Sequence, residues 1–271
     1  MALVFVGLAL AVCYLFQRSA GGVPVLNYHQ INDTEQNALT VNTEQFNAQM
    51  QYLADNGYHT ITPSEMLDAW DSGAELPDKP VIITFDDGYA DNYRHAFPIL
   101  ERYKLKATVF LISDYISTYP NYLTWFDTHV MQESGLITFG SHTLSHEVLS
   151  DGDTSSEIIH QLRGSKEALE WHLGQSVNFI AYPCGTYTEE VKSLTKEAGY
   201  RAAFTVNYGL AEPDEERFIL DRIPIFGSNS HTLFRFKLRL IGAPVIAPLM
   251  RLKQNLNDGG HTLLARLIVI P

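Results

Sequence analysis

Short apolar runs alternate along the chain with amphipathic stretches of helical period. Residues 80–85 (PVIITF) are apolar without interruption, which is typical of a strand covered on both faces. Further strands are predicted at residues 23–28, 59–61, 107–112, 136–139, 177–182 and 202–206. Helices are predicted between them, for example where Phe46, Met50 and Leu53 recur at helical spacing. This order predicts an α/β fold with a parallel sheet.

Chemically active residues follow several of the predicted strands. Asp86 follows one strand, His142 comes shortly after another, and Cys184 comes after a third. In a closed (β/α) barrel the carboxyl ends of all strands meet on one rim, which explains this repeated placement best. An open doubly wound sheet is the alternative. We expect a single catalytic domain over residues 20–230.

Two adjacent carboxylates, Asp86 and Asp87, leave the strand at 80–85 and are followed by Gly88. Such carboxylates repel each other unless a cation or a proton intervenes. The alternative is that one of them only caps the following helix. The motif alone therefore indicates either a cation site or a helix cap.

Two histidines, His142 and His146, lie four residues apart. On a helical turn their imidazoles would share one face and could bind one metal ion. A βα unit would bring each of the two clusters to the same rim, so together they predict a metal site. Two imidazoles and one carboxylate leave open positions, as a catalytic site requires. We expect zinc, although cobalt and nickel share such ligands.

A third motif, residues 181–187 (AYPCGTY), follows another predicted strand. Pro183 and Gly185 are typical of a turn. A bend of this kind can also point a backbone N–H toward a developing oxyanion. We interpret Cys184 as a small turn residue, because neither of the other clusters needs a thiolate. Cys13 is the only other cysteine, so the sequence predicts no disulfide framework.

Charge is distributed unevenly. The net charge of −12 disfavours nucleic acid as a partner. Residues 231–271 nevertheless carry six basic residues and one acidic residue, whereas the first 230 residues carry 13 basic and 30 acidic ones. This basic, apolar tail is predicted either to dock on the barrel as a final helix and strand or to contact a membrane surface.

The chain begins with an uncharged apolar run over residues 1–16, which ends shortly before Arg18. The run is short for a full membrane span and lacks the basic start of a signal peptide. We predict an uncleaved anchor or an atypical export signal over residues 1–19. A buried core helix and a misassigned start are the alternatives. The positive-inside rule would place Arg18 in the cytoplasm, which argues against export.

Together, these motifs resemble the polysaccharide deacetylase family, the carbohydrate esterases with the NodB homology fold. The family's Thr-Phe-Asp-Asp-Gly stands at residues 84–88, and its His-Ser/Thr-x-x-His stands at residues 142–146. The similarity runs from about residue 23 to residue 226. It implies a distorted (β/α) barrel with fewer strands than the usual eight. It also implies that Asp86 is the catalytic base, that the metal is bound by Asp87, His142 and His146, and that the Cys184 N–H helps form the oxyanion hole.

The sequence departs from the family pattern at one position near the third motif. Many members have an arginine where this chain has Ala181, and that arginine orients the catalytic aspartate. Arg222 could supply the missing charge from a later strand. The alternative is a salt bridge between Arg222 and Asp221 at the rim.

A second departure concerns the general acid. No convincing C-terminal strand carries the histidine that many members use. Asn27-Tyr28-His29, at the end of the first strand, instead resembles the branch of poly-N-acetylglucosamine deacetylases, in which this histidine comes from the N-terminal strand. Apart from the metal pair, His29 is also the histidine that directly follows a predicted buried strand. We predict that it is the general acid, because imidazole titrates near neutrality; a histidine that seals the barrel mouth is the alternative.

The resemblance implies removal of N-acetyl groups from N-acetylglucosamine residues of a polysaccharide, with release of acetate. Poly-N-acetylglucosamine is favoured, and peptidoglycan or a chitin-like polymer is the alternative substrate. An O-acetyl esterase or another metal hydrolase, and a catalytically inactive carbohydrate-binding module, are the alternative functions. Aromatic residues are candidates for sugar contacts, namely Tyr89, Trp125 and Tyr182; the alternative is that each belongs to the core. The polymer and the apolar leader together indicate the cell envelope, with the chain either anchored in the membrane or exported.

Overall fold

The computed structural model describes residues 21–150, 152–214, 216–227 and 232–266. The predicted N-terminal anchor and Cys13 lie outside the described residues. The strands, in chain order, are β1 (Val25–Tyr28), β2 (Gln30–Ile31), β3 (Thr40–Val41), β4 (His59–Thr60), β5 (Pro80–Phe85), β6 (Ala107–Leu111), β7 (Ile137–Ser141), β8 (Phe179–Ala181), β9 (Ala202–Tyr208) and β10 (Leu220–Pro224). The helices are α2 (Thr43–Asp55), α3 (Pro63–Ser72), η1 (Asn92–Ala96), α4 (Phe97–Tyr103), α5 (Trp125–Glu133), α6 (Ser155–Leu173), η2 (Pro183–Gly185), α7 (Glu189–Glu197), α8 (Leu233–Asp258) and α9 (Thr262–Ala265).

Seven parallel strands close into a ring. Their order is β1, β10, β9, β8, β7, β6 and β5, and β5 pairs back with β1 in the register Val25–Ile82 to Tyr28–Phe85. β4 pairs only with the first residues of β5 and does not join the ring. The pairing of β1 with β5 excludes the open sheet and confirms the distorted barrel.

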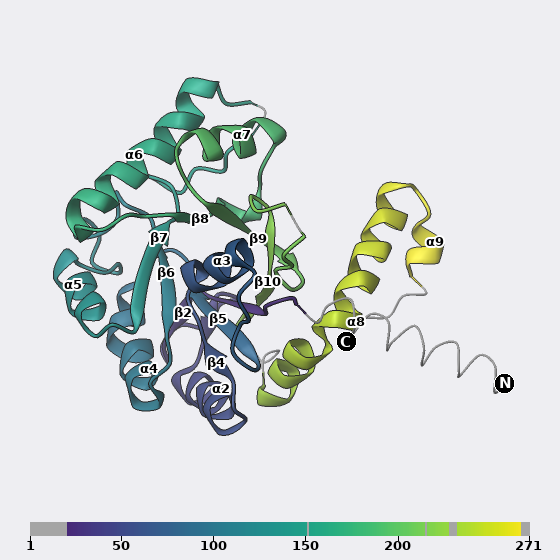
Figure 1. The fold of residues 1–271 in the computed structure, drawn as a ribbon, viewed down its shortest axis with the longest axis horizontal. Helices are drawn as coiled ribbons and strands as arrows, with labels where there is room; N and C mark the ends of the chain where they lie inside the picture. Colours follow the sequence, from purple (N-terminus) through teal and green to yellow (C-terminus); the bar gives the residue numbers. More distant parts are fainter. Residues whose placement is uncertain (1–20, 151, 215, 228–231, 267–271) are drawn as a thin grey trace.

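The strands are buried on both sides because two apolar clusters sandwich them. One cluster combines alternate strand residues such as Leu26 and Ile83 with residues of the surrounding helices. The other combines the intervening strand residues, such as Ile82 and Phe110, with Met66 and other residues of α3. The second cluster therefore fills the barrel, and α3 closes one end of it, as its central position in Figure 1 shows.

The surrounding helices begin at well-defined polar caps. The side chains of Thr62, Thr124 and Thr154 each accept a hydrogen bond from the backbone N–H three residues ahead, and the acidic side chain at that position accepts one from the backbone N–H of the threonine. α3, α5 and α6 therefore all begin with a capping box. Such reciprocal bonds satisfy amide groups that the first helical turn leaves free. α5 and β10 were not predicted as elements with bounds, although Arg222 was expected to lie on a later strand.

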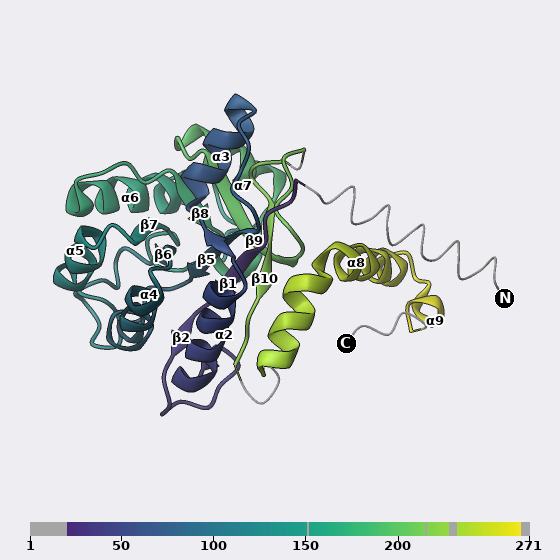
Figure 2. The same ribbon diagram turned by 60° about the horizontal axis from the view of Figure 1, so that its bottom comes forward.

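The basic tail forms the long helix α8 and the short helix α9. Pro244 and Pro248 lie inside α8, where each removes a backbone hydrogen bond, and Figure 2 shows that the helix is bent. The first half of α8 packs on the barrel through Phe236 and Leu240, beside α2. The tail thus docks as helices in the described residues, not as a helix and a strand. Among the described residues, no helix is both long enough and apolar enough to span a bilayer.

Candidate active site

Alternation along the strands aims several polar side chains into the carboxyl end of the barrel. Asp86 lies four residues beyond Ile82, which faces the interior, and therefore continues the inner face of β5. Asn27 on β1 and Arg222 on β10 lie two residues beyond interior residues of their own strands. In the ring, β1 lies between β5 and β10. Three neighbouring strands therefore converge on one polar centre.

Asp87, His142 and His146 form a group that could hold a metal ion. The Oδ1 atom of Asp87 lies 3.3 Å from Nε2 of His142 and 3.4 Å from Nε2 of His146, and all three ligand atoms lie within 4.8 Å of one another. Tetrahedral zinc with bonds of about 2.0–2.1 Å separates its ligand atoms by about 3.3–3.4 Å. Asp87 Oδ1 is also buried without a hydrogen-bond partner. The donor set and its spacing therefore fit a divalent cation.

The two histidines do not lie on a helical turn, which corrects the sequence prediction. Residues 142–146 form a loop in which Thr143 has φ 67° and His146 has φ 62°. The loop is held by Gln161 of α6, whose side-chain oxygen accepts hydrogen bonds from the backbone N–H groups of Leu144 and Ser145. A spacing of four residues fits this loop as well as a helix, and the two rings still lie 4.9 Å apart between centroids.

His142 is oriented by the neighbouring strand. Its Nδ1 lies 2.7 Å from the backbone oxygen of Ala181, so Nδ1 carries the proton and Nε2 faces Asp87. Burial alone would lower the pKa of His142, but its close contact with the Asp87 carboxylate and the negative charges of Asp86 and Asp87 raise it above its usual value. A cation at this position would compete for the same lone pair.

Asp86 forms a buried bidentate ion pair with Arg222. The two carboxylate oxygens accept hydrogen bonds of 2.8 Å and 2.7 Å from the guanidinium, and Asn27 donates a third bond of 2.8 Å. Asp86 is 1% exposed and Arg222 is 0% exposed. Burial alone would raise the pKa of Asp86, but the charges of Arg222 and His142 outweigh it and hold the pKa well below its usual range. The carboxylate therefore stays ionised.

The alternative partner for Arg222 is engaged elsewhere. Asp221 faces the other side of β10 and pairs with Arg251 of α8. The rim salt bridge between Arg222 and Asp221 is therefore not the arrangement in the structure. Arg222 also donates to the backbone oxygen of Thr205, which fixes the guanidinium from a neighbouring strand.

His29 lies beside Asp86 on the same rim. Its Nε2 is 4.0 Å from Oδ2 of Asp86, and its backbone oxygen accepts a hydrogen bond from the Asn92 side chain. Its ring is mostly buried and packs against Phe226 at 6.0 Å between centroids. Burial lowers the pKa of His29, although the carboxylates of Asp86 and Asp87 oppose this shift. The neutral ring is therefore the favoured form at neutral pH.

The third motif forms a tight turn at the end of β8. Cys184 is exposed and adopts φ 55°, and Gly185 adopts φ 69°. A Cβ atom on Gly185 would lie 2.7 Å from the backbone nitrogen of Val206, so only glycine fits this approach to β9. Asp87, Thr143 and His146 also have positive φ, which places several of the least favourable backbone conformations around one centre.

The three aromatic candidates for sugar contacts have different positions. Tyr89 stacks on Tyr122 at 5.0 Å and is close enough to Asp87 for that carboxylate to help burial raise its pKa. Trp125 instead stacks on His172, near the end of α6, at 3.9 Å. Tyr182 is fully buried in the core. The structure therefore does not support a sugar contact of Tyr182, whose ring has no exposed surface, whereas the contact of Trp125 stays a prediction.

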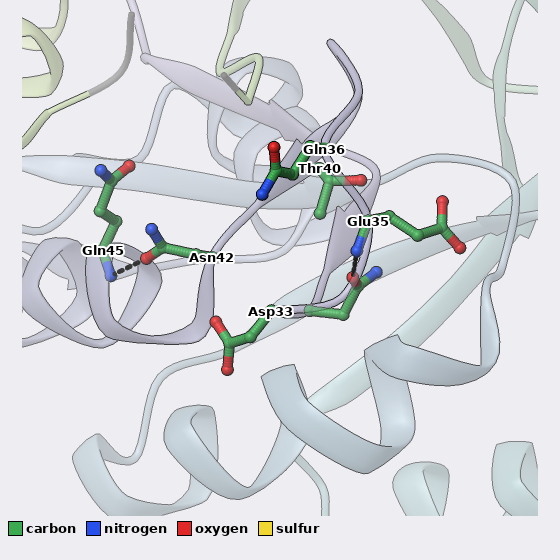
Figure 3. A pocket seen from close by; sticks show the side chains of 7 residues that line it. Asp33, Glu35, Gln36, Thr40, Asn42 and Gln45 are labelled. Carbon is green, nitrogen blue, oxygen red and sulfur yellow. Dashed lines mark hydrogen bonds between the residues drawn. The ribbon is translucent and has the colours of Figure 1, made fainter. Parts of the chain in front are cut away.

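A polar pocket of about 510 Å³ lies beside β2 and β3. Figure 3 shows that amide and carboxylate side chains line it and that Asn42 caps α2 by accepting a hydrogen bond from the Gln45 N–H. The lining includes Asn32, which also donates to Asp91. No residue of the Asp87 group lines this pocket, so it is separate from the candidate metal site.

Comparisons with known proteins agree with this geometry. The sequence model of the polysaccharide deacetylases matches residues 73–203. The Bacillus subtilis protein YxkH, which is assigned to the same family, is 35% identical over 212 residues, which make up 78% of this chain and 74% of that protein. The chain belongs to the polysaccharide deacetylase family.

Two further proteins are similar to this chain over most of its length. The poly-beta-1,6-N-acetyl-D-glucosamine N-deacetylase of Staphylococcus epidermidis is 27% identical over 235 residues, covering 78% of this chain and 81% of that protein. Among solved structures, the Streptococcus pyogenes deacetylase PplD, determined in complex with acetate, is similar with a TM-score of 0.75 at 28% identity. The match covers 81% of this chain and 98% of that one. The barrel is therefore the fold of known polysaccharide deacetylases.

Three residues of this deacetylase's site were not predicted. Asn27 was noted only as part of the motif before His29. It lies on the inner face of β1, two residues before His29, so alternation along the strand could have identified it. Asn92 belongs to η1, a π-helical turn, and Gln161 lies on α6. Asn92 holds the backbone of His29 and Gln161 holds the loop between His142 and His146, each through a side-chain amide, and nothing in the sequence indicates such contacts.

We predict that Arg222→Met lowers the free energy of unfolding by about 3–5 kcal/mol, because it leaves the buried Asp86 carboxylate without a counter-charge. The matched control is Arg217→Met, which breaks the exposed pair of Arg217 with Asp71 and should cost at most about 1 kcal/mol. Urea unfolding of both variants measures the difference.

A second change separates charge from packing in the same experiment. Adding Asp86→Leu to Arg222→Met removes the unpaired charge and should restore most of the lost stability. Equal losses for Arg222→Met and Arg217→Met, or no recovery in the double variant, would contradict the ion pair as described.

Proposed function

We propose that the protein is a metal-dependent N-deacetylase that removes acetyl groups from N-acetylglucosamine residues of a polysaccharide and releases acetate. The observation that carries the proposal is that a metal-binding group, Asp87 with His142 and His146, lies directly beside the ionised carboxylate Asp86. Poly-N-acetylglucosamine is the proposed polymer, because the Staphylococcus relative is named for that substrate.

The proposed metal is zinc, held by one carboxylate and two imidazoles. Cobalt and nickel accept the same donors. When bound, such an ion polarises the acetamide carbonyl and makes a nearby water more acidic. The three donors come from the loops after β5 and β7, which the barrel holds on one rim.

Asp86 is proposed as the base that accepts a proton from the attacking water. Arg222 and Asn27 hold both of its oxygens, so the carboxylate is ionised and its direction is fixed. His29 Nε2 lies 4.0 Å from Oδ2 of Asp86. The protonated His29 ring donates its proton to the leaving nitrogen, and the proton that Asp86 accepted from water can then pass to the imidazole and restore its protonated form. The amine must be protonated as the C–N bond breaks, because an amide anion is too basic to leave.

The turn at Cys184 is proposed to stabilise the oxyanion through its backbone N–H. Tyr89, beside Asp87, is proposed to contact the sugar that carries the acetamide. We also propose that the protein works in the cell envelope. The apolar run over residues 1–16 supports this location.

The proposal is tested by acetate release from β-1,6-linked N-acetylglucosamine oligomers. His142→Ala should lose both bound metal and activity, because one of three protein ligands is removed. Asp86→Asn should keep the metal and lose turnover by about 100- to 10,000-fold, as expected for the loss of a general base. His160→Ala, on the exposed face of α6, is the control and should change neither.

Elemental analysis of each purified variant accompanies the assay. Full acetate release by a metal-free preparation would refute metal dependence. Faster release from an O-acetylated polysaccharide than from the N-acetylated oligomer would favour the esterase instead. Loss of metal from Asp86→Asn would exchange the proposed roles of Asp86 and Asp87.

His29→Ala should keep the fold and the metal but lower turnover, because the leaving amine loses its proton donor. The protonated ring is required and its pKa lies below the ordinary value, so kcat/KM should fall as pH rises through a pKa below about 6.5. That fall should be absent in His29→Ala. Near-normal turnover of this variant, with an unchanged pH profile, would make His29 a packing residue at the barrel mouth.

A further inference from the structure

The basic tail carries a second apolar surface that the barrel does not cover. α8 docks on the barrel through one stripe, namely Phe236, Leu240, Ala243 and Ala247. Another apolar stripe starts two residues before Phe236, about 200° round the helix from it. Its residues recur every three or four positions. We call it the outer stripe, and it consists of Phe234, Leu238, Ile241, Val245, Leu249, Leu252 and Leu256.

Four of the seven residues of the outer stripe are exposed, and the other three are half-buried. Phe234 is 73% exposed, Ile241 is 52% exposed and Leu252 is 49% exposed. In the described part of the chain, six of the ten exposed large hydrophobic side chains belong to α8 and α9. Both views show the second half of α8 and α9 projecting from the barrel beside each other (Figures 1 and 2). A surface helix normally presents polar residues to water, so this face is suited to an apolar partner.

Basic residues flank the outer stripe on both sides. Arg235 and Lys253 follow stripe residues on one flank, and Lys237 and Arg251 lie on the other. Lys237 lies over the Tyr52 ring and Arg251 pairs with Asp221, so the second flank is tied to the barrel. An apolar stripe between basic flanks is the pattern of a helix that lies in a membrane interface.

We propose that the outer stripe of α8 and its basic flanks dock on the surface of an anionic lipid bilayer. The charge distribution favours this occupant. The first 230 residues carry 30 acidic and 13 basic side chains and would be repelled by anionic lipid, whereas the tail would be attracted. A second copy of α8 on the same stripe would bring basic flanks against each other, which disfavours a dimer.

Docking would set how the barrel is held relative to the membrane. The stripe that packs on the barrel and the outer stripe lie on opposite sides of one helix, so α8 would separate the barrel from the lipid. Arg251 and Asp221 link that helix to β10, the strand that carries Arg222. The inference does not rest on the proposed deacetylase activity, because it uses only the exposure and charge of the tail.

The test uses the full chain with a single environment-sensitive fluorophore. Leu252→Cys places the label on the outer stripe, and Asn257→Cys places it on an exposed position off the stripe. Both are made with Cys13→Ser and Cys184→Ser. In vesicles of mixed phosphatidylglycerol and phosphatidylcholine, the label at 252 should shift to shorter wavelength and be quenched by lipid-borne quenchers. The label at 257 should stay in water.

The apolar run over residues 1–16 could tether both labelled proteins to the vesicles. The difference in emission between the labels at 252 and 257 is therefore what reports on α8. Adding Lys253→Gln to the Leu252→Cys protein should weaken the lipid-contacting state about fivefold, the factor for about 1 kcal/mol per basic residue. Equal emission at 252 and 257 would overturn the proposal, as would a shift that is the same in pure phosphatidylcholine. An apolar signal at 252 without vesicles, in a protein that sediments as a dimer, would assign the stripe to a second copy.

Discussion

The buried ion pair between Arg222 and Asp86 is the interaction on which the site depends. It joins β10 to β5, and β1 lies between them in the ring and contributes Asn27 to the same carboxylate. A charge in the barrel interior is tolerated only when it is paired with good geometry. Closure of the barrel by β1 therefore also assembles the candidate site, since an open sheet would not bring both Arg222 and Asn27 to Asp86.

Two adjacent carboxylates acquire different surroundings from this arrangement. Asp86 faces the barrel interior, where both of its oxygens are hydrogen bonded. Asp87 has φ 74°, and this backbone conformation turns its side chain toward His142 and His146. One carboxylate is thus committed to protein donors, while Oδ1 of the other has none. The proposed division into a base and a metal ligand follows from this difference in partners.

Much of the barrel and of the candidate site could be predicted from sequence. The carboxyl ends of parallel barrel strands meet on one rim, so polar residues that follow these strands must lie close together. The strands around Asp86 and His142, and the convergence of Asp87 with both histidines, follow from that rule. The loop conformation at His146 could not be predicted, since a spacing of four suits a loop as well as a helix. The partner of Arg222 depends on which way a strand residue faces, and its two candidates, Asp86 and Asp221, were equally open. Whether Tyr182 is exposed could not be predicted either, because a residue at a strand end can face the core as Tyr182 does.

The most direct test of the account is a crystal structure of the zinc-loaded protein with anomalous data at the zinc edge. The account predicts one strong peak bounded by Asp87 Oδ1 and the Nε2 atoms of His142 and His146, with Asp86 still paired to Arg222 and outside bonding distance of the ion. A peak coordinated by Asp86, or zinc found only elsewhere on the protein, would contradict the central claim that the two neighbouring carboxylates have separate roles.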